Sequence, residues 1–286
     1  MAFVMRGSST AREDFAILVG NDIADEQIDL LAAVFAIARI EYPDLNTAEQ
    51  IHRVDQLALR VKRLVRPAAD PRDIVWALNH VLFEVEAFRG NRDDYYDPLN
   101  SFLNEVLDRK VGIPITLSIL YMEVARRVGF PMSGVGMPGH FLLKYYDIDG
   151  RDTLIDVYEN GRIVSPADCQ SRLDQIYSGQ VPLQPDFLQP VGRRQILTRV
   201  LNNLKSIYLN SRSFRKALPV VDLILTIYPR SPEDVKARAL LRYSVGQLRG
   251  SVEDFEDYLK MSPEASDADE IRQTALSIRR TMANMN

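Results

Sequence analysis

Residues 89–98 read RGNRDDYYDP, and three shorter motifs follow them: GIP at 112–114, GFP at 129–131 and PGHF at 138–141. Between GIP and GFP, residues 115–128 carry only three charged side chains, Glu123, Arg126 and Arg127. A helix that is apolar on almost every side is normally buried, and proline suits the first helical position. The motifs therefore predict a central buried helix that begins at Pro114 and stops before Gly129.

After this helix the pattern changes to that of strands. Residues 141–146 and 153–158 are rich in apolar and aromatic side chains, and residues 162–164 form a third short run. Asp149-Gly150 and Asn160-Gly161 separate the runs with residue pairs that favour hairpin turns. Three antiparallel strands are expected, followed by a helix that starts after Ser165-Pro166.

Helical periodicity precedes the central motifs. Apolar residues recur at helical spacing over 28–38, over 46–64 and over 70–85. The second of these segments opens with a capping box formed by Asn46 and Glu49, and the third opens with Asp70-Pro71. The first ninety residues are thus expected to form a helical layer with apolar faces to bury.

Helical repeats are expected towards the C-terminal end. Pro229 and Pro263 lie 34 residues apart, which is the tetratricopeptide period, and each follows a pair of helical segments. Arg238 stands where such a repeat usually has a core residue. The helix pairs are 195–210 with 214–228 and 232–245 with 251–261, and a further helix over 271–285 would close the array. Generic helical hairpins are the alternative interpretation.

These patterns predict an α+β fold class with N-terminal helices, a core with a small antiparallel sheet, and C-terminal α-hairpins. The expected divisions are a helical subdomain over 1–90, the core over 91–177, a proline-containing linker over 178–192 and the repeats over 193–286.

Composition excludes several functional classes. The 286 residues include 35 Lys and Arg against 39 Asp and Glu, so no broad basic surface for nucleic acid is implied. No apolar run reaches membrane-spanning length, and the first ten residues lack the apolar core of a secretory signal. One cysteine and three scattered histidines do not suggest a metal site. We expect a cytoplasmic protein without metal or cofactor that binds neither nucleic acid nor membrane.

The central motifs resemble the transglutaminase-like superfamily, in its bacterial SirB-type branch. In that family, which has a cysteine-protease-like core, the nucleophilic cysteine begins a buried helix, and a histidine and an aspartate follow on adjacent strands. A helix dipole and a nearby imidazolium stabilise the thiolate, and the carboxylate orients the imidazole. The resemblance assigns the histidine to His140 and the acid to Asp156. It assigns the cysteine position to Pro114, which has no nucleophilic group.

Two other side chains could replace the missing nucleophile. Ser118 lies four residues after Pro114 on the same face of the helix, about 6 Å further along the axis. Its alternative role is helix packing or hydrogen bonding to the helix carbonyls. Cys169 follows both His140 and Asp156 in the chain, and a lone cysteine is more often a small buried hydrophobe.

His140 itself has two interpretations. It could form a buried hydrogen-bonded pair with Asp156 that holds two strands together, in which case loss of either partner would leave an unsatisfied polar group. It could instead line a cleft and contact a ligand or act as a base.

Polar residues of the first motif are the next candidates for a binding surface. They are characteristic of the SirB-type branch and could line the same cleft as His140: Asn91, Asp93, Asp94, Tyr95, Tyr96, Asn100 and Asn104. A calcium loop is disfavoured because its further oxygen ligands and glycine-centred spacing are missing.

Two functions follow. The first is a non-catalytic interaction protein, a pseudoenzyme whose helical repeats bind a protein or peptide partner. The second is a hydrolase or acyl transferase that uses His140, Asp156 and Ser118 without a cysteine.

Overall fold

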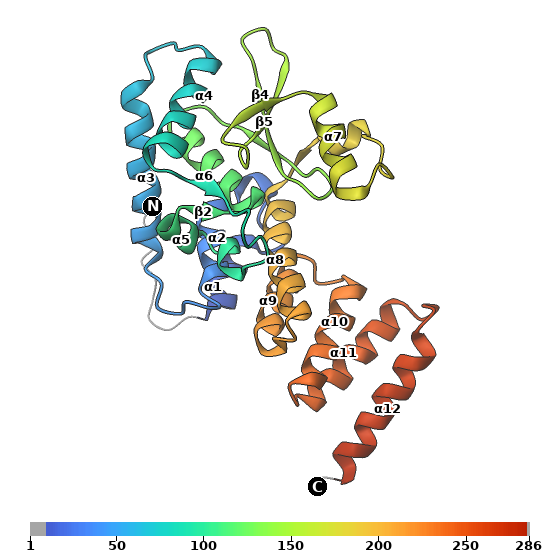
Figure 1. Ribbon diagram of the computed structural model, residues 1–286. Coiled ribbons are helices and arrows are strands. Elements are labelled where there is room, and N and C mark those ends of the chain that lie inside the picture. Colours follow the sequence, from blue (N-terminus) through green and yellow to red (C-terminus); the bar gives the residue numbers. More distant parts are fainter. Residues whose placement is uncertain (1–9, 285–286) are drawn as a thin grey trace. The chain divides into compact units, whose positions relative to one another are not determined.

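The computed structural model describes residues 10–284 (Figure 1). These residues form two compact units. The first, called here the core unit, spans Ala24–Val200. The second, the repeat unit, combines the described residues up to Ile23 with Leu201 onwards. The boundary near residue 200 falls inside helix α8 (Arg193–Asn210).

Helices make up one layer of the core unit. Side-chain caps start α3 at Asn46, which accepts from the Glu49 N–H, and α4 at Asp70, which accepts from the Arg72 N–H. Helix α6 is largely buried and begins with Pro114, as predicted. The layer contains α2 (Leu30–Ala38), α3 (Thr47–Leu64), α4 (Pro71–Asn79) with its π-helical extension His80–Val85, α5 (Leu103–Arg109) and α6 (Pro114–Arg127).

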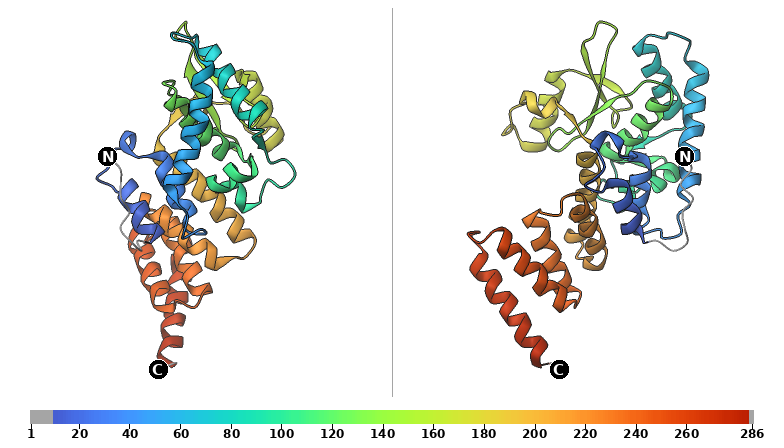
Figure 2. Two further views of the ribbon diagram at one scale, coloured as in Figure 1. Left: turned by 90° about the vertical axis from the view of Figure 1, so that its left-hand side faces the viewer. Right: turned by 180° about the vertical axis from the view of Figure 1, so that it is seen from behind.

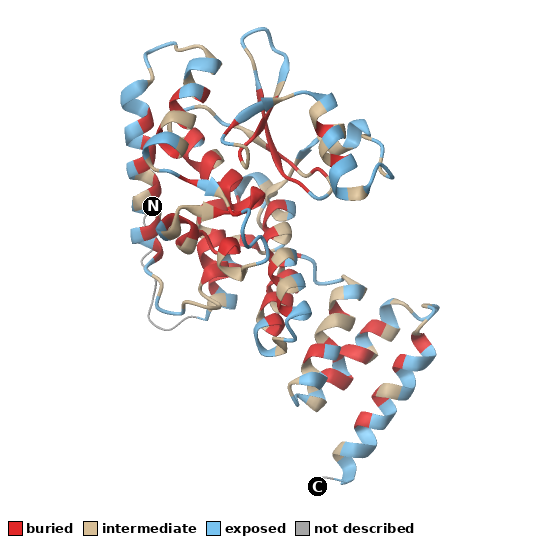
Figure 3. Cartoon of the chain, viewed as in Figure 1, coloured by how far each residue is buried: buried red, intermediate tan, exposed pale blue. Residues whose placement is uncertain are grey.

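A five-stranded antiparallel sheet packs against this layer, in the order β6-β5-β4-β3-β7. Its strands are β3 (Ser133–Val135), β4 (Leu142–Tyr146), β5 (Asp152–Asp156), β6 (Arg162–Val164) and β7 (Pro190–Val191). Helix α6 lies against β3 and β4. Helix α7 (Pro166–Tyr177) covers the opposite face of the sheet (Figure 2). Buried residues concentrate on α6, on the first four residues of β4 and on the last three of β5 (Figure 3).

A short parallel ladder connects the first motif to the start of the central helix. Strand β1 (Arg89–Gly90) pairs with β2 (Val111–Gly112), and the Asn91 N–H donates to the Gly112 carbonyl at 2.8 Å. The RGN and GIP motifs are therefore neighbours in space, although about twenty residues separate them in the sequence.

The repeat unit is entirely helical among the described residues. Its helices are α1 (Ala11–Val19), the end of α8, α9 (Phe214–Ile227), α10 (Pro232–Ser244), α11 (Leu248–Met261) and α12 (Ala268–Asn284). From α9 to α12 each helix packs against the next, and α1 packs against α9. This is the arrangement expected of stacked helix pairs.

Arg238 is accommodated in the repeat unit by ion pairs instead of apolar packing. Its guanidinium donates to both carboxylate oxygens of Asp254, at 2.7 and 3.0 Å, and to Asp222 at 3.2 Å. Asp254 is only 2% exposed and also pairs with Arg242 at 2.9 Å. A fork-shaped guanidinium can thus join α9, α10 and α11 at a position where a core residue is usual.

The expected α+β class with C-terminal repeats is confirmed, and so are its main helices and strands. Helix α1 and strands β1, β2, β3 and β7 were not expected from the sequence. Residues 178–192, expected as a linker, contain β7, which pairs with β3. Just after this segment, the N–H groups of Arg193 and Arg194 donate to Asp25. Residues 178–192 therefore lie within the core unit. Met285, the last residue of the expected closing helix, lies outside the described residues.

Candidate functional site

His140 follows a tight turn between β3 and β4. Gly139 has a φ of +69°, and a Cβ there would lie 2.9 Å from the Ile176 side chain, so the turn requires glycine. Arg199 fixes the turn from α8 by donating to the carbonyls of Met137 at 3.0 Å and His140 at 2.6 Å. Burial of this guanidinium lowers the pKa of Arg199. The backbone around His140 is therefore held rigidly.

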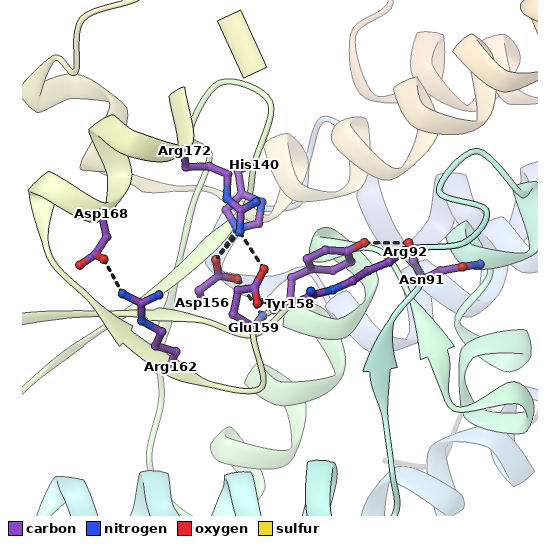
Figure 4. Close-up of polar contacts among 9 residues, drawn as sticks. All are labelled: Asn91, Arg92, His140, Asp156, Tyr158, Glu159, Arg162, Asp168 and Arg172. Atoms are coloured by element: carbon purple, nitrogen blue, oxygen red, sulfur yellow. Dashed lines mark hydrogen bonds and ion pairs between the residues drawn. The ribbon is translucent and has the colours of Figure 1, made fainter. Parts of the chain in front are cut away.

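Asp156 lies at the end of β5 and has two tasks. Its Oδ1 accepts from the N–H groups of Tyr158 and Glu159, at 3.0 and 3.2 Å, which forms the turn into β6. Its Oδ2 lies 2.8 Å from Nε2 of His140. Both side chains are 4% exposed, so they form a buried pair (Figure 4). The pair leaves Nδ1 as the ring nitrogen without a hydrogen-bond partner among the described residues.

A cleft of about 290 Å³ lies between α7 and the β5–β6 hairpin, with the His140–Asp156 pair in its wall. Its charged side chains are paired: Arg172 with Glu159 at 2.8 Å, and Arg162 with Asp168. Arg172 also lies 3.8 Å from Asp156. The lining residues are Met137, His140, Leu142, Asp156, Glu159, Arg162, Val164, Asp168, Cys169, Ser171, Arg172 and Gln175.

The amino end of α6 carries no nucleophile. Pro114 is its first residue, and the hydroxyl of Thr116 accepts from the Ile113 N–H at 3.2 Å. The same hydroxyl donates to the Asn100 carbonyl at 2.8 Å. The Thr116 side chain thus satisfies the Ile113 N–H, a donor that an anion at this helix end could otherwise use.

Neither candidate replacement for the nucleophile has an activating partner. Ser118 is fully buried, and its Oγ has no hydrogen-bond partner among the described residues, so His140 does not contact it as a base. Cys169 lines the cleft but is 2% exposed and belongs to an apolar cluster with Met137 and Leu173. Burial, together with the charges of Asp168 and Asp156, raises the pKa of the Cys169 thiol, which opposes thiolate formation.

The residues of the first motif form a hydrogen-bonded loop. Asn91 donates to Asn100 at 3.0 Å and accepts from the Asp94 N–H at 3.0 Å, and Asn100 donates to the carbonyls of Asp94 and Tyr95. Asp93 is exposed, as are Tyr95 and Tyr96, and the buried Oδ1 of Asn104 has no partner among the described residues. None of the seven candidates from this segment lines the cleft.

Tyr158 connects this loop to His140. Its hydroxyl donates to the Asn91 carbonyl at 2.7 Å, and its ring lies edge-to-face with the imidazole at a centroid distance of 6.2 Å. A Cβ on Gly90 would lie 2.4 Å from the Tyr158 ring, which explains the glycine of the RGN motif. The loop therefore holds Tyr158 in place, and the Tyr158 ring packs against the imidazole of His140.

Sequence reasoning missed four charged residues of the cleft: Glu159, Arg162, Asp168 and Arg172. They lie on a turn, a short edge strand and the polar face of α7, where charged side chains are usually solvated. No sequence signal distinguishes them from ordinary surface residues. Among the described residues no group of three or more His, Cys, Asp or Glu side chains is placed to hold a metal ion.

Comparison with known families agrees with this geometry. Residues 48–202, more than half of the chain, match the transglutaminase-like superfamily. The chain belongs to that superfamily. Residues 204–275 match the tetratricopeptide repeat, so the repeats proposed from the 34-residue period are confirmed.

Relatives in several organisms support the same assignment. A UPF0162 protein of Xylella fastidiosa is 34% identical over 258 residues, which cover 87% of this chain and 90% of that protein. F-box only protein 21 of Homo sapiens is 31% identical over 180 residues, 59% of this chain and 28% of that protein. Protein SirB1 of Salmonella typhimurium is 22% identical over 171 residues, 60% of this chain and 63% of that protein. These similarities confirm the resemblance to the SirB-type branch.

Within residues 10–284, none of the helices combines the length and the apolar character needed to cross a bilayer.

Proposed function

We propose that this protein is a non-catalytic member of the transglutaminase-like superfamily that binds a protein or peptide partner through its helical repeats. The observation that carries the proposal is that exposed apolar side chains recur on alternate helices of the repeat unit. Leu209 and Tyr243 lie 34 residues apart on α8 and α10, the first helices of the two helix pairs. Leu276 lies 33 residues after Tyr243, on the closing helix α12. They are 37%, 51% and 46% exposed.

Salt bridges support the side-by-side arrangement of these first helices. Lys205 of α8 pairs with Asp234 of α10 at 2.8 Å, and Lys236 of α10 pairs with Asp267, the residue before α12, at 2.8 Å. Stacked helical repeats present an extended surface, and such surfaces suit extended or helical peptides. The three apolar side chains, called here the repeat row, would contact apolar side chains of the partner.

The non-catalytic part of the proposal is supported by the site in the core unit. The resemblance assigns the family's nucleophile position to Pro114, which begins α6, and the Ser118 hydroxyl has no hydrogen-bond partner among the described residues. Burial raises the pKa of the Cys169 thiol, which opposes thiolate formation. In this proposal His140 and Asp156 serve as a buried structural pair.

A peptide-display selection tests the binding function. Random peptides are selected on the full-length protein, and binding of the enriched peptides is compared between wild type and the double variant Tyr243→Ser/Leu276→Ser. We expect the double variant to lose at least about tenfold in affinity, because two exposed apolar anchors are removed. The matched control is Tyr228→Ser/Met261→Ser, which removes side chains that are each 40% exposed at the ends of the second helices. Equal loss in both double variants, or no enrichment on wild type, would contradict the proposal.

A separate experiment tests for residual catalysis. The native protein is incubated with an electrophilic acyl probe, alongside His140→Ala and Ser118→Ala. We expect no labelling above that of the variants. Labelling of wild type that both substitutions abolish would instead establish the hydrolase or acyl transferase function.

A further inference from the structure

Arg199 of α8 is a half-buried cation without a carboxylate partner. Its Nη2 donates to the carbonyls of Met137 and His140, and no Asp or Glu side chain among the described residues bonds to it. Its Cζ lies 5.6 Å from the centroid of the Phe141 ring, which is also uncharged. A charge that folding removes from water is normally compensated by an opposite charge. Within residues 10–284 the chain supplies no such charge to Arg199.

Arg127 shows how another half-buried arginine is compensated. Its guanidinium pairs with Asp55 and Glu123. Burial lowers the pKa of Arg127, but the two carboxylates outweigh burial and raise the pKa above its ordinary value. For Arg199 burial prevails and the pKa is lowered. Arg199 therefore carries a positive charge that its surroundings leave unbalanced.

Part of the Arg199 guanidinium is free to donate. A guanidinium has five N–H groups, and only those of Nη2 are used on the two carbonyls. Nε and Nη1 have no hydrogen-bond partner in the described part of the chain, yet neither atom is completely buried. Gly136 lies beside Nη1 without a side chain, since a Cβ there would be 3.7 Å away. A ligand can thus reach these N–H groups from solvent.

Two phenols lie near the same guanidinium. The Tyr177 hydroxyl would be 3.3 Å from a Cβ on Gly139, in the turn whose carbonyls Arg199 holds. Burial raises the pKa of Tyr95, and the charge of Arg199 lowers it in part, so the two side chains are within reach of each other's charge. Neither phenol hydroxyl has a hydrogen-bond partner among the residues that the structure describes. Both can therefore donate to a ligand held by Arg199.

This combination of one unbalanced positive charge and several donors suits an oxyanion. Carboxylate and phosphate oxygens accept charge-assisted hydrogen bonds from a guanidinium, and its planar fork can bind two oxygens at once. A phenol donates to the same kind of oxygen. A halide ion would balance the charge but could not accept from the fork through two separate atoms.

We propose that Arg199, Tyr95 and Tyr177 bind the oxyanion group of a ligand beside the turn from Met137 to His140. The group is a carboxylate or a phosphate, which share this chemistry. The bound oxyanion supplies the counter-charge that the guanidinium lacks. The site lies wholly in the core unit, so it is separate from the repeat row.

NMR titrations of the full-length protein test the site with acetate and with inorganic phosphate, at an ionic strength kept constant with sodium chloride. The backbone amide resonance of Gly139, in the turn that Arg199 holds, reports binding. We expect a saturable shift with a dissociation constant below about 10 mM for at least one of the two anions. Saturation by only one anion assigns that class of ligand, and if both saturate, the tighter one assigns it.

Variants identify the groups that bind the anion. Arg199→Gln should weaken binding at least about tenfold, because the charge is lost. This variant also loses the hydrogen bonds to the turn and could fail to fold, so Tyr95→Phe/Tyr177→Phe provides a second test. The double variant removes only two hydroxyls and should also weaken binding at least about tenfold. The control is Tyr146→Phe, at a tyrosine of β4 that is 65% exposed, which should leave the affinity unchanged.

Three results would overturn the proposal. The first is the absence of a saturable shift with either anion. The second is an equal response of the Gly139 resonance to sodium chloride alone. The third is an unchanged affinity in Tyr95→Phe/Tyr177→Phe or in folded Arg199→Gln.

Discussion

At the scale of single residues, the burial of His140 and its hydrogen bond to Asp156 determine how this side chain contributes to stability. Its imidazole is almost completely buried and hydrogen-bonded to an equally buried carboxylate. A buried pair of this kind stabilises the fold because removing one partner leaves the other unsatisfied.

His140→Ala should therefore lower the free energy of unfolding by about 1–3 kcal/mol, measured by urea denaturation. Asp156 keeps its two backbone N–H donors in the variant, which favours the lower half of this range. The control is His52→Ala, an exposed histidine, which should change the free energy by less than about 0.5 kcal/mol. If His140→Ala were as harmless as the control, the pair would not be structural.

Cys169 should be a poorly reactive thiol. Burial first, and then the charges of Asp168 and Asp156, raise its pKa above the ordinary value. Iodoacetamide should thus alkylate native protein much more slowly than urea-unfolded protein at pH 8, as followed by intact mass. Rapid alkylation of the native chain at neutral pH would identify a thiolate and revive Cys169 as a nucleophile.

The same shift has a consequence for stability against pH. A pKa raised in the folded state means that the thiol contributes its full stabilisation below the unfolded-state pKa, about 8.5, and loses it as pH rises through the folded-state value. Wild type should therefore lose stability relative to Cys169→Ala above about pH 8.5. Parallel pH profiles of the two proteins in thermal unfolding would contradict this expectation.

At the scale of elements, two turns show how much a neighbouring helix adds to a local preference. Gly150 and Gly161 both have positive φ, at +70° and +74°. Nothing lies near a Cβ at Gly150, whereas a Cβ at Gly161 would lie 1.9 Å from Oδ1 of Asn79. Asn79 donates to the Gly161 carbonyl at 3.1 Å and accepts from the Tyr121 hydroxyl at 2.9 Å.

Gly150→Ala should cost about 1–2 kcal/mol of unfolding free energy, for the left-handed backbone alone. Gly161→Ala should cost about 2–4 kcal/mol, because it also displaces Asn79 from its two hydrogen bonds. Chemical denaturation of the two variants gives the comparison directly. Equal costs would mean that Asn79 moves aside without loss.

In the repeat unit, the ion pairs of Arg238 should also contribute to the free energy of unfolding. Arg238→Ala should lower the unfolding free energy by about 3 kcal/mol, because Asp254 keeps only Arg242 as a charged partner in a buried position. Adding Asp254→Ala should cost less than the sum of the two single substitutions. Arg249→Ala, an exposed arginine, is the control. Additive losses would show that the two side chains are not coupled.

At the scale of the whole molecule, the division into two compact units predicts which residues each destabilising substitution affects. Hydrogen exchange measured by mass spectrometry should show lost protection within residues 24–200 for Gly161→Ala, and within residues 10–23 and 201–284 for Arg238→Ala. Loss of protection across both units in either variant would mean that the chain unfolds as a single cooperative body.

Local signals predicted much of this protein from its sequence. Pro114 marked the start of the buried helix, Asn160-Gly161 marked a hairpin turn, and the 34-residue spacing of Pro229 and Pro263 marked the repeats. Such signals act over a few residues or at a fixed period, because they reflect backbone preference and the burial of an apolar face. Strand β7 escaped prediction because a two-residue strand has no periodicity, and it exists only through its pairing with β3.

The residue sequence by itself thus determined the helices, the hairpin turns, the repeat period and the proline that begins the buried helix. Only the tertiary structure decided which charges surround His140, that Arg172 reaches Glu159 and that Arg238 joins two aspartates. The reason is physical: a charged side chain on a helix has the same local preferences whether water or a distant segment of the chain satisfies it, and only the packed fold chooses between the two.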